Sequence, residues 1–582
     1  MNLRAKTGRI LISSISLLLI SAGFLLAQPE FPMEKIFLRT DRDSYIAGEE
    51  VLFKIYTMDA SSQTPVHYSD IVYLELLDRQ HSPLIRKKFA LRKGESNGAI
   101  LLPIEMKSEY YYLRAYTSWM KNAGASGYAY QFLSVINPFE KISSEMISSE
   151  HDKKFIDNKK QGFQMNPLSG LPGMKILAGF EHKPSGRRQK MILEINTSDS
   201  SGAPVEASLM LSIARKGLLS VTDRELPIYK NQQETSLDIP YPPERGGHII
   251  RGKLSQKYRE GLFRSDTLIY SVVGKRAIFD YTISDSLGNF RFLAKGMEGP
   301  HEIVIQNLNP LKSDCQIRLE DPFSSDFPEL QLPSFRLDTN HLENINQAVI
   351  SAQINALYAE EAIESDPDPV LLSFYGQPEQ ELILGDYIKL PEMREVFFEL
   401  IPNAQIHENE DQVAIRIKNK WTDFHFVSEP LMLVDGVVTR EALQISELDP
   451  QKVERIDLVN VGYYWGILHF PGIVSVFTNE GKCPLNLPNC FLRQSYEFVS
   501  AAASPEFPVY GRIEKNPDLN RPDFRNTLYW NPDIRTDENG KAMIEFYTSD
   551  DVSDYVLMIR GFTGDGLSGF YTDTISVTDQ IY

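Results

Sequence analysis

The chain contains 582 residues, of which 42% are hydrophobic and 24% are charged, and its formal net charge is −18. This length exceeds what one hydrophobic core organises, so we expect several domains, and the composition is that of packed protein rather than of a disordered chain. The negative charge, with no basic stripe to offset it, argues against a nucleic-acid partner, because phosphates would be repelled.

Residues 1–27 have the features of a secretory signal peptide. Arg4, Lys6 and Arg9 form a basic head, an apolar run follows, and Ala27 is the expected last residue before cleavage. We therefore expect an exported protein, located in the periplasm, at the outer membrane or on the cell surface. A retained membrane anchor is the alternative, although the apolar run barely reaches spanning length.

The three cysteines are Cys315, Cys483 and Cys490. Export permits disulfides, and the prolines between Cys483 and Cys490 bend the short segment that joins them, so a disulfide between these two is predicted. Two unpaired thiols are the alternative. Cys315 is expected to be a buried single thiol, and no metal site is expected because no histidine lies at ligand spacing from the pair.

Residues 31–140 read as short strands separated by turns. Val51, Phe53 and Ile55 alternate with residues of the opposite face, and Asn97-Gly98 is a hairpin-type turn. About seven such strands in about a hundred residues, with almost no helical periodicity, predict a β-sandwich.

Two motifs in this region resemble a known family. TDRDSYIAGEEVLFKIY, with Asp41, Tyr45, Gly48 and Glu49, is similar to the opening of a macroglobulin-type domain. The later YYYLRAYTSWMKN resembles the matching strand of an exported macroglobulin-like family of Gram-negative cell envelopes. The resemblance implies a mainly β protein built from tandem immunoglobulin-like, macroglobulin β-sandwiches.

Two further sandwiches are predicted after a polar linker at 141–174. Residues 175–246 carry a strand, a Ser201-Gly202 turn and a second strand, which resembles another macroglobulin-like sandwich. Residues 247–322 resemble the transthyretin-like regulatory module found beside carboxypeptidases, with Asp285 and Gly288 in a tight turn and phenylalanines after it. That module contains no peptidase chemistry.

A helical connecting region is predicted at 339–400. Its clearest helix runs from Thr339 to Ala362, where Asn340 and Glu343 can form a capping box. The apolar stripe that should pack on the rest of the protein comprises Leu342, Ile345, Val349, Ile354 and Leu357. A second helix is expected in PEMREVFFELIP.

Residues 401–481 resemble the plug domain of TonB-dependent outer-membrane receptors. The resemblance rests on PLMLVDGVV, on the strand GIVSVFTNE and on the predicted order of two strands, a helix and two strands. It implies a small α+β domain. The channel of such receptors needs about 22 strands of about 10 residues, whereas 582 − 481 = 101 residues follow. We therefore expect any channel to come from another polypeptide.

Residues 482–582 resemble a C-terminal macroglobulin segment. Trp530, Asp537, Gly540, Phe546 and Tyr555 carry the match. The Cys-x-Glu-Gln thioester of protease-trapping macroglobulins is absent from the sequence, so covalent capture of a target is not expected.

The sequence offers few candidate functional residues. Ser118 and Lys121 fit a Ser-x-x-Lys pattern without its partner motifs. Tyr463, Tyr464 and Trp465 are candidates for an interaction surface, because aromatic residues dominate interface energetics; a core position is the alternative. No catalytic residue, cofactor or metal is expected.

These observations predict a non-catalytic envelope protein that binds other proteins, in particular an outer-membrane β-barrel or its assembly or uptake complex. Membrane association would then be peripheral and through the partner. One alternative is a non-covalent protease binder with Ser143–Gln161 as its bait segment. The other is an envelope peptidase or hydrolase.

Overall fold

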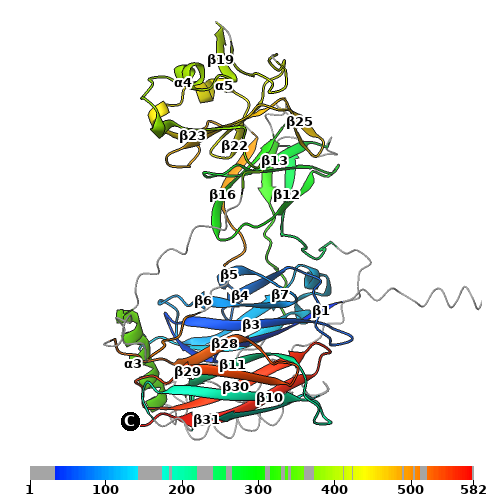
Figure 1. Cartoon of the computed structure of the whole chain (residues 1–582). Helices are drawn as coiled ribbons and strands as arrows, with labels where there is room; N and C mark the ends of the chain where they lie inside the picture. Colours follow the sequence, from blue (N-terminus) through cyan, green and yellow to red (C-terminus); the bar gives the residue numbers. More distant parts are fainter. Residues whose placement is uncertain are drawn as a thin grey trace, which may run out of the picture.

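The computed structural model shows a mainly β protein with a broad base and an upper lobe (Figure 1). The structure describes residues 33–141, 173–182, 186–218, 240–256, 265–308, 315–328, 335–337, 342–358, 372–409, 412–422, 424–487, 490–501, 505–510 and 521–579. The predicted signal peptide, nearly all of the predicted linker and Asn340 of the predicted capping box lie outside these residues. Within them, no helix is both long and apolar enough to cross a membrane.

The first sandwich of the base is formed by residues 34–136. One sheet has the order β1 (Glu34–Thr40), β3 (Glu50–Asp59), β6 (Glu95–Leu101). The other has the order β2 (Ser44–Ile46), β8 (Ala129–Ile136), β7 (Glu109–Tyr116), β4 (Ile71–Leu77), β5 (Pro83–Ala90). Alternating apolar residues of both sheets, such as Val51, Phe53 and Ile55, are fully buried between them. The predicted sandwich is confirmed.

The second sandwich of the base is assembled from two distant segments. One sheet has the order β29 (Lys541–Tyr547), β10 (Lys190–Ser198), β9 (Lys175–Phe180). The other has the order β28 (Thr527–Arg535), β11 (Ala207–Arg215), β30 (Asp554–Thr563), β31 (Ser568–Ser576). Residues 175–246 and 482–582 were expected to form separate modules, and this division is wrong. Three strands cannot enclose a core, so they recruit four from the end of the chain.

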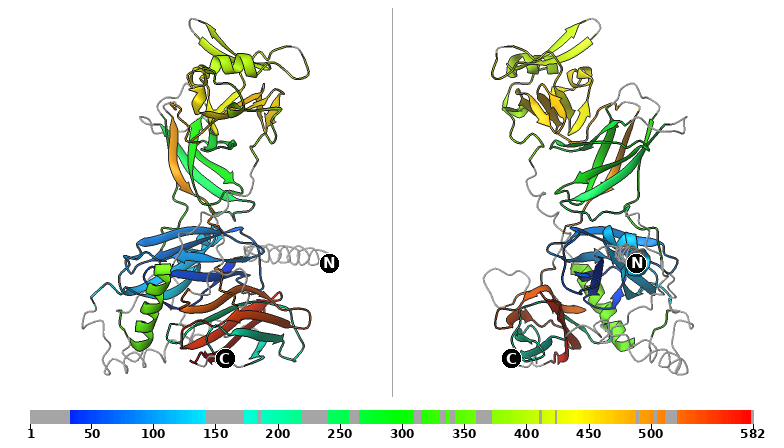
Figure 2. Two further views of the ribbon diagram at one scale, coloured as in Figure 1. Left: turned by 60° about the vertical axis from the view of Figure 1, so that its left-hand side comes forward. Right: turned by 90° about the vertical axis from the view of Figure 1, so that its right-hand side faces the viewer.

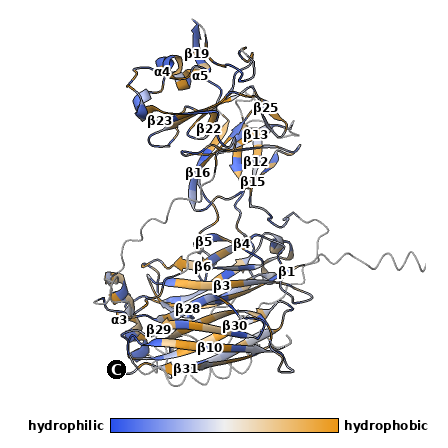
Figure 3. Ribbon diagram, in the orientation of Figure 1, coloured by the Kyte–Doolittle hydropathy of each residue, from blue (hydrophilic) through white to orange (hydrophobic). Residues whose placement is uncertain are grey.

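The four sheets of the base are stacked as layers (Figure 2). Between the sandwiches, Trp530 is buried with Leu52 and Met210, while Phe562 packs on Phe37. Figure 3 shows hydrophobic residues along the strands that meet there. The two sandwiches therefore pack against one another in part through apolar contacts.

The upper lobe begins with a third sandwich. One sheet has the order β15 (Asn289–Ala294), β12 (His248–Gln256), β17 (Cys315–Leu319). The other has the order β14 (Ile278–Ile283), β13 (Thr267–Val272), β16 (Pro300–Asn307), β27 (Phe491–Glu497). Phe290 and Phe292 are buried in its core, and β27 extends the module beyond its predicted limit of residue 322.

The cysteine pairing differs from the prediction. Cys315 and Cys490 form the disulfide, with Cα atoms 5.4 Å apart, while Cys483 is a buried free thiol. Cys315 and Cys490 belong to the core of the third sandwich, because β17 and β27 bring them together. Cys483 belongs to the core of the neighbouring domain instead. Sequence proximity of Cys483 and Cys490 was therefore misleading.

The far part of the upper lobe is an α+β domain in the region predicted to be plug-like. Its sheet has the order β18 (Gln380–Ile383), β23 (Val453–Val459), β26 (Ile473–Thr478), β21 (Leu431–Val434), β22 (Val437–Thr439). Helices α4 (Met393–Leu400) and α5 (Ala442–Ser446) pack on its core. Strand β20 (Gln412–Ile417) pairs with β19 (Ala404–Asn409) in a separate hairpin.

The Asp435-Gly436 turn joins this domain to the third sandwich. Asp435 is fully buried, and its carboxylate accepts hydrogen bonds from the backbone N–H groups of Thr478 and Cys483, each at 2.7 Å. Gly436 has a φ of +80°, and a Cβ there would lie 2.5 Å from the carbonyl oxygen of Val272. Only glycine fits this contact.

Replacing Gly436 by alanine should lower the free energy of unfolding by about 2 kcal/mol or more, because both backbone strain and the clash with a fixed carbonyl oppose the new methyl group. Gly202→Ala is the matched control, since Gly202 has a φ of +90° and nothing lies within 4 Å of its would-be Cβ. Urea unfolding of both variants measures the difference. Equal losses would show that the contact with Val272 is unimportant.

Helix α3 (Leu342–Tyr358) lies at the side of the base (Figure 1). The predicted helix is confirmed, but its buried face is narrower than the predicted stripe. Ala348 and Ser351 are buried, Ile345 and Val349 are partly buried, and Leu357 is 81% exposed. The small residues at 348 and 351 let the helix approach the base closely.

Candidate protein-binding surface

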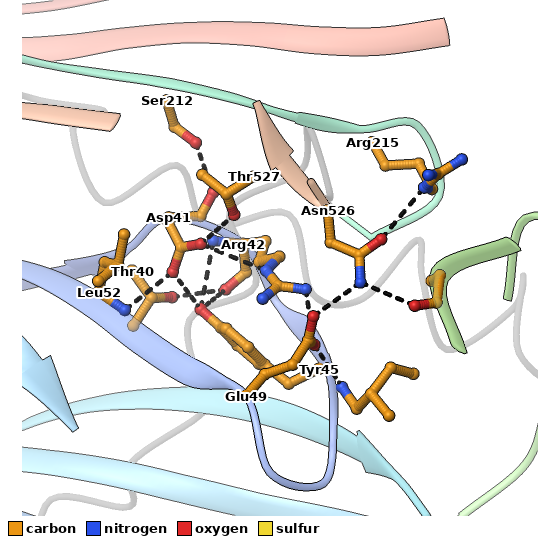
Figure 4. A network of polar contacts seen from close by, with 12 residues as sticks. Thr40, Asp41, Arg42, Tyr45, Glu49, Leu52, Ser212, Arg215, Asn526 and Thr527 are labelled. Atoms are coloured by element: carbon orange, nitrogen blue, oxygen red, sulfur yellow. Dashed lines mark hydrogen bonds and ion pairs between the residues drawn. The ribbon is translucent and has the colours of Figure 1, made fainter. Parts of the chain in front are cut away.

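The motif beginning at Asp41 forms a buried joint between the two sandwiches of the base (Figure 4). The Asp41 carboxylate accepts hydrogen bonds from the Tyr45 hydroxyl at 2.7 Å and from the Leu52 N–H at 3.0 Å. It also accepts one from the Thr527 hydroxyl, which belongs to β28 of the second sandwich. Burial raises the pKa of Asp41 even though Arg42 lies beside it. The motif is structural.

A second branch of this joint reaches helix α3. Glu49 accepts hydrogen bonds from Arg42 at 2.9 Å and from the Asn526 amide at 2.7 Å. Asn526 in turn donates to the Ala348 carbonyl at 2.9 Å, and Arg215 donates to the Asn526 side chain at 3.2 Å. The base and α3 are thus joined by one polar network.

The junction between the base and the upper lobe contains a second buried network. The Nδ1–H group of His248 donates a hydrogen bond to a carboxylate oxygen of Glu244 at 2.8 Å. The Nε2 atom therefore accepts hydrogen bonds from the Tyr496 hydroxyl at 2.5 Å and from the Lys88 amine at 3.2 Å. Glu244 also accepts from the Tyr73 hydroxyl at 2.8 Å. Lys88 and Tyr73 lie in the base, whereas His248 and Tyr496 lie in the upper lobe.

These groups make the junction sensitive to pH. Burial and the adjacent Lys88 lower the pKa of His248, against the opposing effect of the hydrogen bond that His248 donates to Glu244. Burial also lowers the pKa of Lys88, to about 8. A histidine whose pKa is lower in the folded state stabilises the fold above its unfolded value of about 6.5, and that contribution is lost as the pH falls. Protonation would place a second cation against Lys88.

Lowering the pH from about 7 to about 5 should therefore reduce the free energy of unfolding by about 1 kcal/mol through His248. His248→Gln keeps hydrogen-bonding groups but takes up no proton, so it should flatten this part of the pH profile. Urea midpoints at each pH provide the measurement, and His469→Gln on the exposed surface is the control. An unchanged profile in His248→Gln would contradict the assignment.

Ser118 and Lys121 both line a cavity of about 250 Å³ at this junction. Burial lowers the pKa of Lys121 to about 8. Its amine donates to the Pro322 carbonyl and lies 5.2 Å and 4.9 Å from the ring centroids of Tyr73 and Tyr241. These contacts explain the burial of Lys121 by a structural role at the junction between the base and the upper lobe.

The predicted interaction surface at 463–465 is divided between core and solvent. The three residues form β24 (Tyr463–Trp465), which pairs with β25 (Leu468–Phe470). Tyr463 donates to the Phe374 carbonyl at 2.8 Å, and Trp465 packs on the Phe374 ring. Tyr464 points away and is 71% exposed, as is Ile467 at 72%. The candidate surface on this hairpin is therefore Tyr464 with Ile467.

The most exposed apolar side chains of the described residues gather in the upper lobe. Among the described residues, ten large hydrophobic side chains are at least 70% exposed, and eight of them lie between residues 372 and 467. These eight are Leu372, Ile388, Phe398, Trp421, Phe424, Val427, Tyr464 and Ile467. Single exposed apolar residues are ordinary, whereas several in one domain make it a candidate interaction surface.

A shallow groove lies on the same domain, between α4 and β19. Its volume is about 370 Å³, and its lining includes Phe398, Arg394 and His407. Within the described part of the chain, no three metal-ligating side chains come together. The groove presents the aromatic ring of Phe398 beside the charged side chains of Arg394 and Glu395. This combination suits contact with a protein surface.

Sequence reasoning missed Trp421, Phe424 and Val427. They follow β20 in a loop whose Lys420 N–H donates to the Asn460 carbonyl at 2.9 Å, which places the loop beside the segment leading into β24. The available signal was KWTDFHFV, a cluster of aromatic residues without the regular alternation of a strand. Ser143–Gln161, the bait segment considered for a protease binder, lies outside the described residues.

No known protein family and no curated protein matches the chain. Solved structures with a detectable likeness include trypsin-activated alpha-2-macroglobulin from Escherichia coli, at 10% identity and a TM-score of 0.24, covering 94% of this chain and 42% of that one. Salmonella alpha-2-macroglobulin reacted with methylamine has 11% identity and a TM-score of 0.24, with 94% and 39% covered. Latent PorU from Porphyromonas gingivalis has 10% identity and a TM-score of 0.15, with 48% and 33% covered.

The chain spans about two fifths of the length of these macroglobulins. Bacterial alpha-2-macroglobulins are thus among its structural neighbours, but at such TM-scores the likeness supports no statement about function. The transthyretin-like and plug-like resemblances of the sequence stay predictions.

Proposed function

We propose that this protein is a non-catalytic scaffold of the cell envelope that binds a protein partner through exposed apolar side chains of its upper lobe. The partner we favour is an outer-membrane β-barrel or a component of its transport or assembly complex. The observation that carries the proposal is the concentration of exposed apolar side chains between residues 372 and 467.

The construction of the molecule supports this role. The base buries its polar motifs in joints between layers, as Asp41 and Glu49 illustrate, and among its described residues only Phe139 and Leu357 are large hydrophobic side chains at least 70% exposed. The upper lobe is connected to the base through the buried contacts of His248. A base that carries a domain with exposed apolar side chains is suited to binding a partner, and this role requires no cofactor.

Crosslinking in intact envelopes, followed by affinity purification of the full chain, tests the proposal. The wild type should capture a distinct partner, and the double variant Tyr464→Ser, Ile467→Ser should capture about tenfold less, because exposed aromatic and aliphatic residues dominate interface energies. Leu101→Ser, at a 64% exposed position of the base, is the matched control. Recovery of the protein alone, or equal capture by the double variant, would reject the proposal.

The non-catalytic part of the proposal has its own test. The purified protein should show no turnover in a broad screen of peptidase and esterase substrates. Turnover that is lost in Lys121→Ala would instead make the junction cavity an active site.

A further inference from the structure

The loop that follows β20 combines exposed apolar side chains with positive charge. We call residues 416–427 the basic aromatic loop. Trp421 and Phe424 are each 78% exposed and Val427 is 89% exposed, so three large apolar side chains within seven residues face water. Exposure of this extent is unfavourable in the isolated protein, because transfer of each apolar side chain out of water would lower the free energy.

Backbone contacts hold the loop in a defined shape. The Asn419 N–H donates to the Phe424 carbonyl at 3.0 Å, and the Trp421 N–H donates to the Asn419 side chain at 2.8 Å. The Phe426 N–H donates to the Ile417 carbonyl at 3.0 Å, while the Phe426 side chain packs on the domain core. The outward direction of Trp421 and Phe424 is therefore built into the turn.

The charges of the loop contrast with the rest of the chain. The loop contains Arg416, Lys418 and Lys420 against one acidic residue, in a protein whose net charge is −18. The Lys420 amine lies 5.4 Å from the Trp421 ring centroid and 3.9 Å from a carboxylate oxygen of Glu379. Since an exposed ion pair of this length contributes little, Lys420 keeps most of its attraction for anions.

Aromatic and aliphatic side chains flanked by lysine and arginine are the combination that binds the interface of an anionic membrane. We propose that the basic aromatic loop docks on an anionic lipid bilayer, with Trp421, Phe424 and Val427 entering the headgroup region. A bilayer attracts this loop while repelling the acidic remainder of the chain, so the protein would stand with its upper lobe toward the membrane. This inference goes beyond the proposed function and does not depend on it.

Vesicle binding of the full mature chain tests this inference. Vesicles of phosphatidylcholine are compared with vesicles that also contain phosphatidylglycerol, by co-sedimentation and by tryptophan fluorescence. Trp421 is the most exposed of the four tryptophans, so its emission should shift to shorter wavelength on anionic vesicles only. Binding should weaken as salt screens the charges.

Three variants separate the contributions. Trp421→Ser, Phe424→Ser, Val427→Ser together should reduce vesicle binding by at least about tenfold. Lys418→Gln with Lys420→Gln should reduce binding to anionic vesicles by about fivefold per lysine. Leu101→Ser with Leu357→Ser is the matched control, since these residues of the base are 64% and 81% exposed and lack flanking lysines, and it should bind vesicles like the wild type.

The inference is wrong if the wild type ignores anionic vesicles, or if the triple variant sediments with them as well as the wild type does. Loss of a crosslinked protein in the triple variant, without any vesicle binding by the wild type, would assign the loop to a protein contact instead. The proposed function fails on a different result, namely unchanged partner capture by the Tyr464 and Ile467 double variant.

Discussion

Replacing Asp41 by alanine should lower the free energy of unfolding by about 3–5 kcal/mol, the cost of removing one member of a buried ionic network. Asp41 is fully buried and holds Tyr45, Leu52 and Thr527 at once. Without the carboxylate, these donors lose their acceptor and the Arg42 cation keeps only Glu49 as a counter-charge. Urea unfolding with the linear extrapolation measures the loss.

The effect should extend to both sandwiches, because Thr527 belongs to the second one. The urea unfolding transitions followed by tyrosine fluorescence and by far-ultraviolet circular dichroism should therefore both shift to lower urea concentration in Asp41→Ala. Glu50→Ala removes an exposed carboxylate from the same strand region and should change the free energy of unfolding by less than about 0.5 kcal/mol. A loss in Asp41→Ala as small as that in Glu50→Ala would show that the joint does not hold the base together.

Removing the Cys315–Cys490 disulfide should cost about 3–5 kcal/mol, because the bridge closes a loop across a sequence separation of 175 residues. The loop includes the whole far domain of the upper lobe. Loss of the disulfide therefore gives a long chain segment more conformational freedom in the unfolded state. Cys315→Ala and Cys490→Ala should each show the loss under non-reducing conditions. Their difference from wild type should vanish once the wild type is reduced.

Cys483→Ala is the control for this prediction. Burial raises the pKa of the Cys483 thiol to about 11, which makes it a poor nucleophile, and its removal should cost less than about 1.5 kcal/mol. Peptide mapping of the unreduced protein should recover Cys315 joined to Cys490. A peptide containing Cys483 joined to Cys490 would contradict the structure.

Local patterns predicted much of the fold. Alternation in residues 50–59 predicted the strand β3, because side chains of a strand alternate with a period of two, but both of its faces are buried since the second sandwich covers the other one. The helix around 342–358 was predicted from spacing alone. The Asp435-Gly436 pair within PLMLVDGVV forms a turn after β21, where the positive φ favours glycine.

Pairings over long distances could not be predicted in this way. The contact between β10 and β29 joins residues more than three hundred positions apart, and either strand is compatible with many partners. The same reason explains the disulfide, because only the third sandwich brings Cys315 to Cys490. Folding of the base therefore requires the end of the chain.

The candidate surface was predicted only in part. Tyr464 was named from its aromatic neighbours, but only the structure separates it from Tyr463 and Trp465, which face inward. Trp421 and Phe424 lie in a loop whose alternation is broken, so no periodicity marks which side chains face water. Exposure of such residues depends on tertiary packing.

The central claim is that the upper lobe, rather than the base, contacts the partner. A photocrosslinking residue placed at position 464, and in a separate variant at position 177 of the base, tests it in intact envelopes. Leu177 is 52% exposed and provides the comparison within the same chain. We predict a discrete crosslinked protein from position 464 and none from position 177. Crosslinks from position 177 alone would contradict this account.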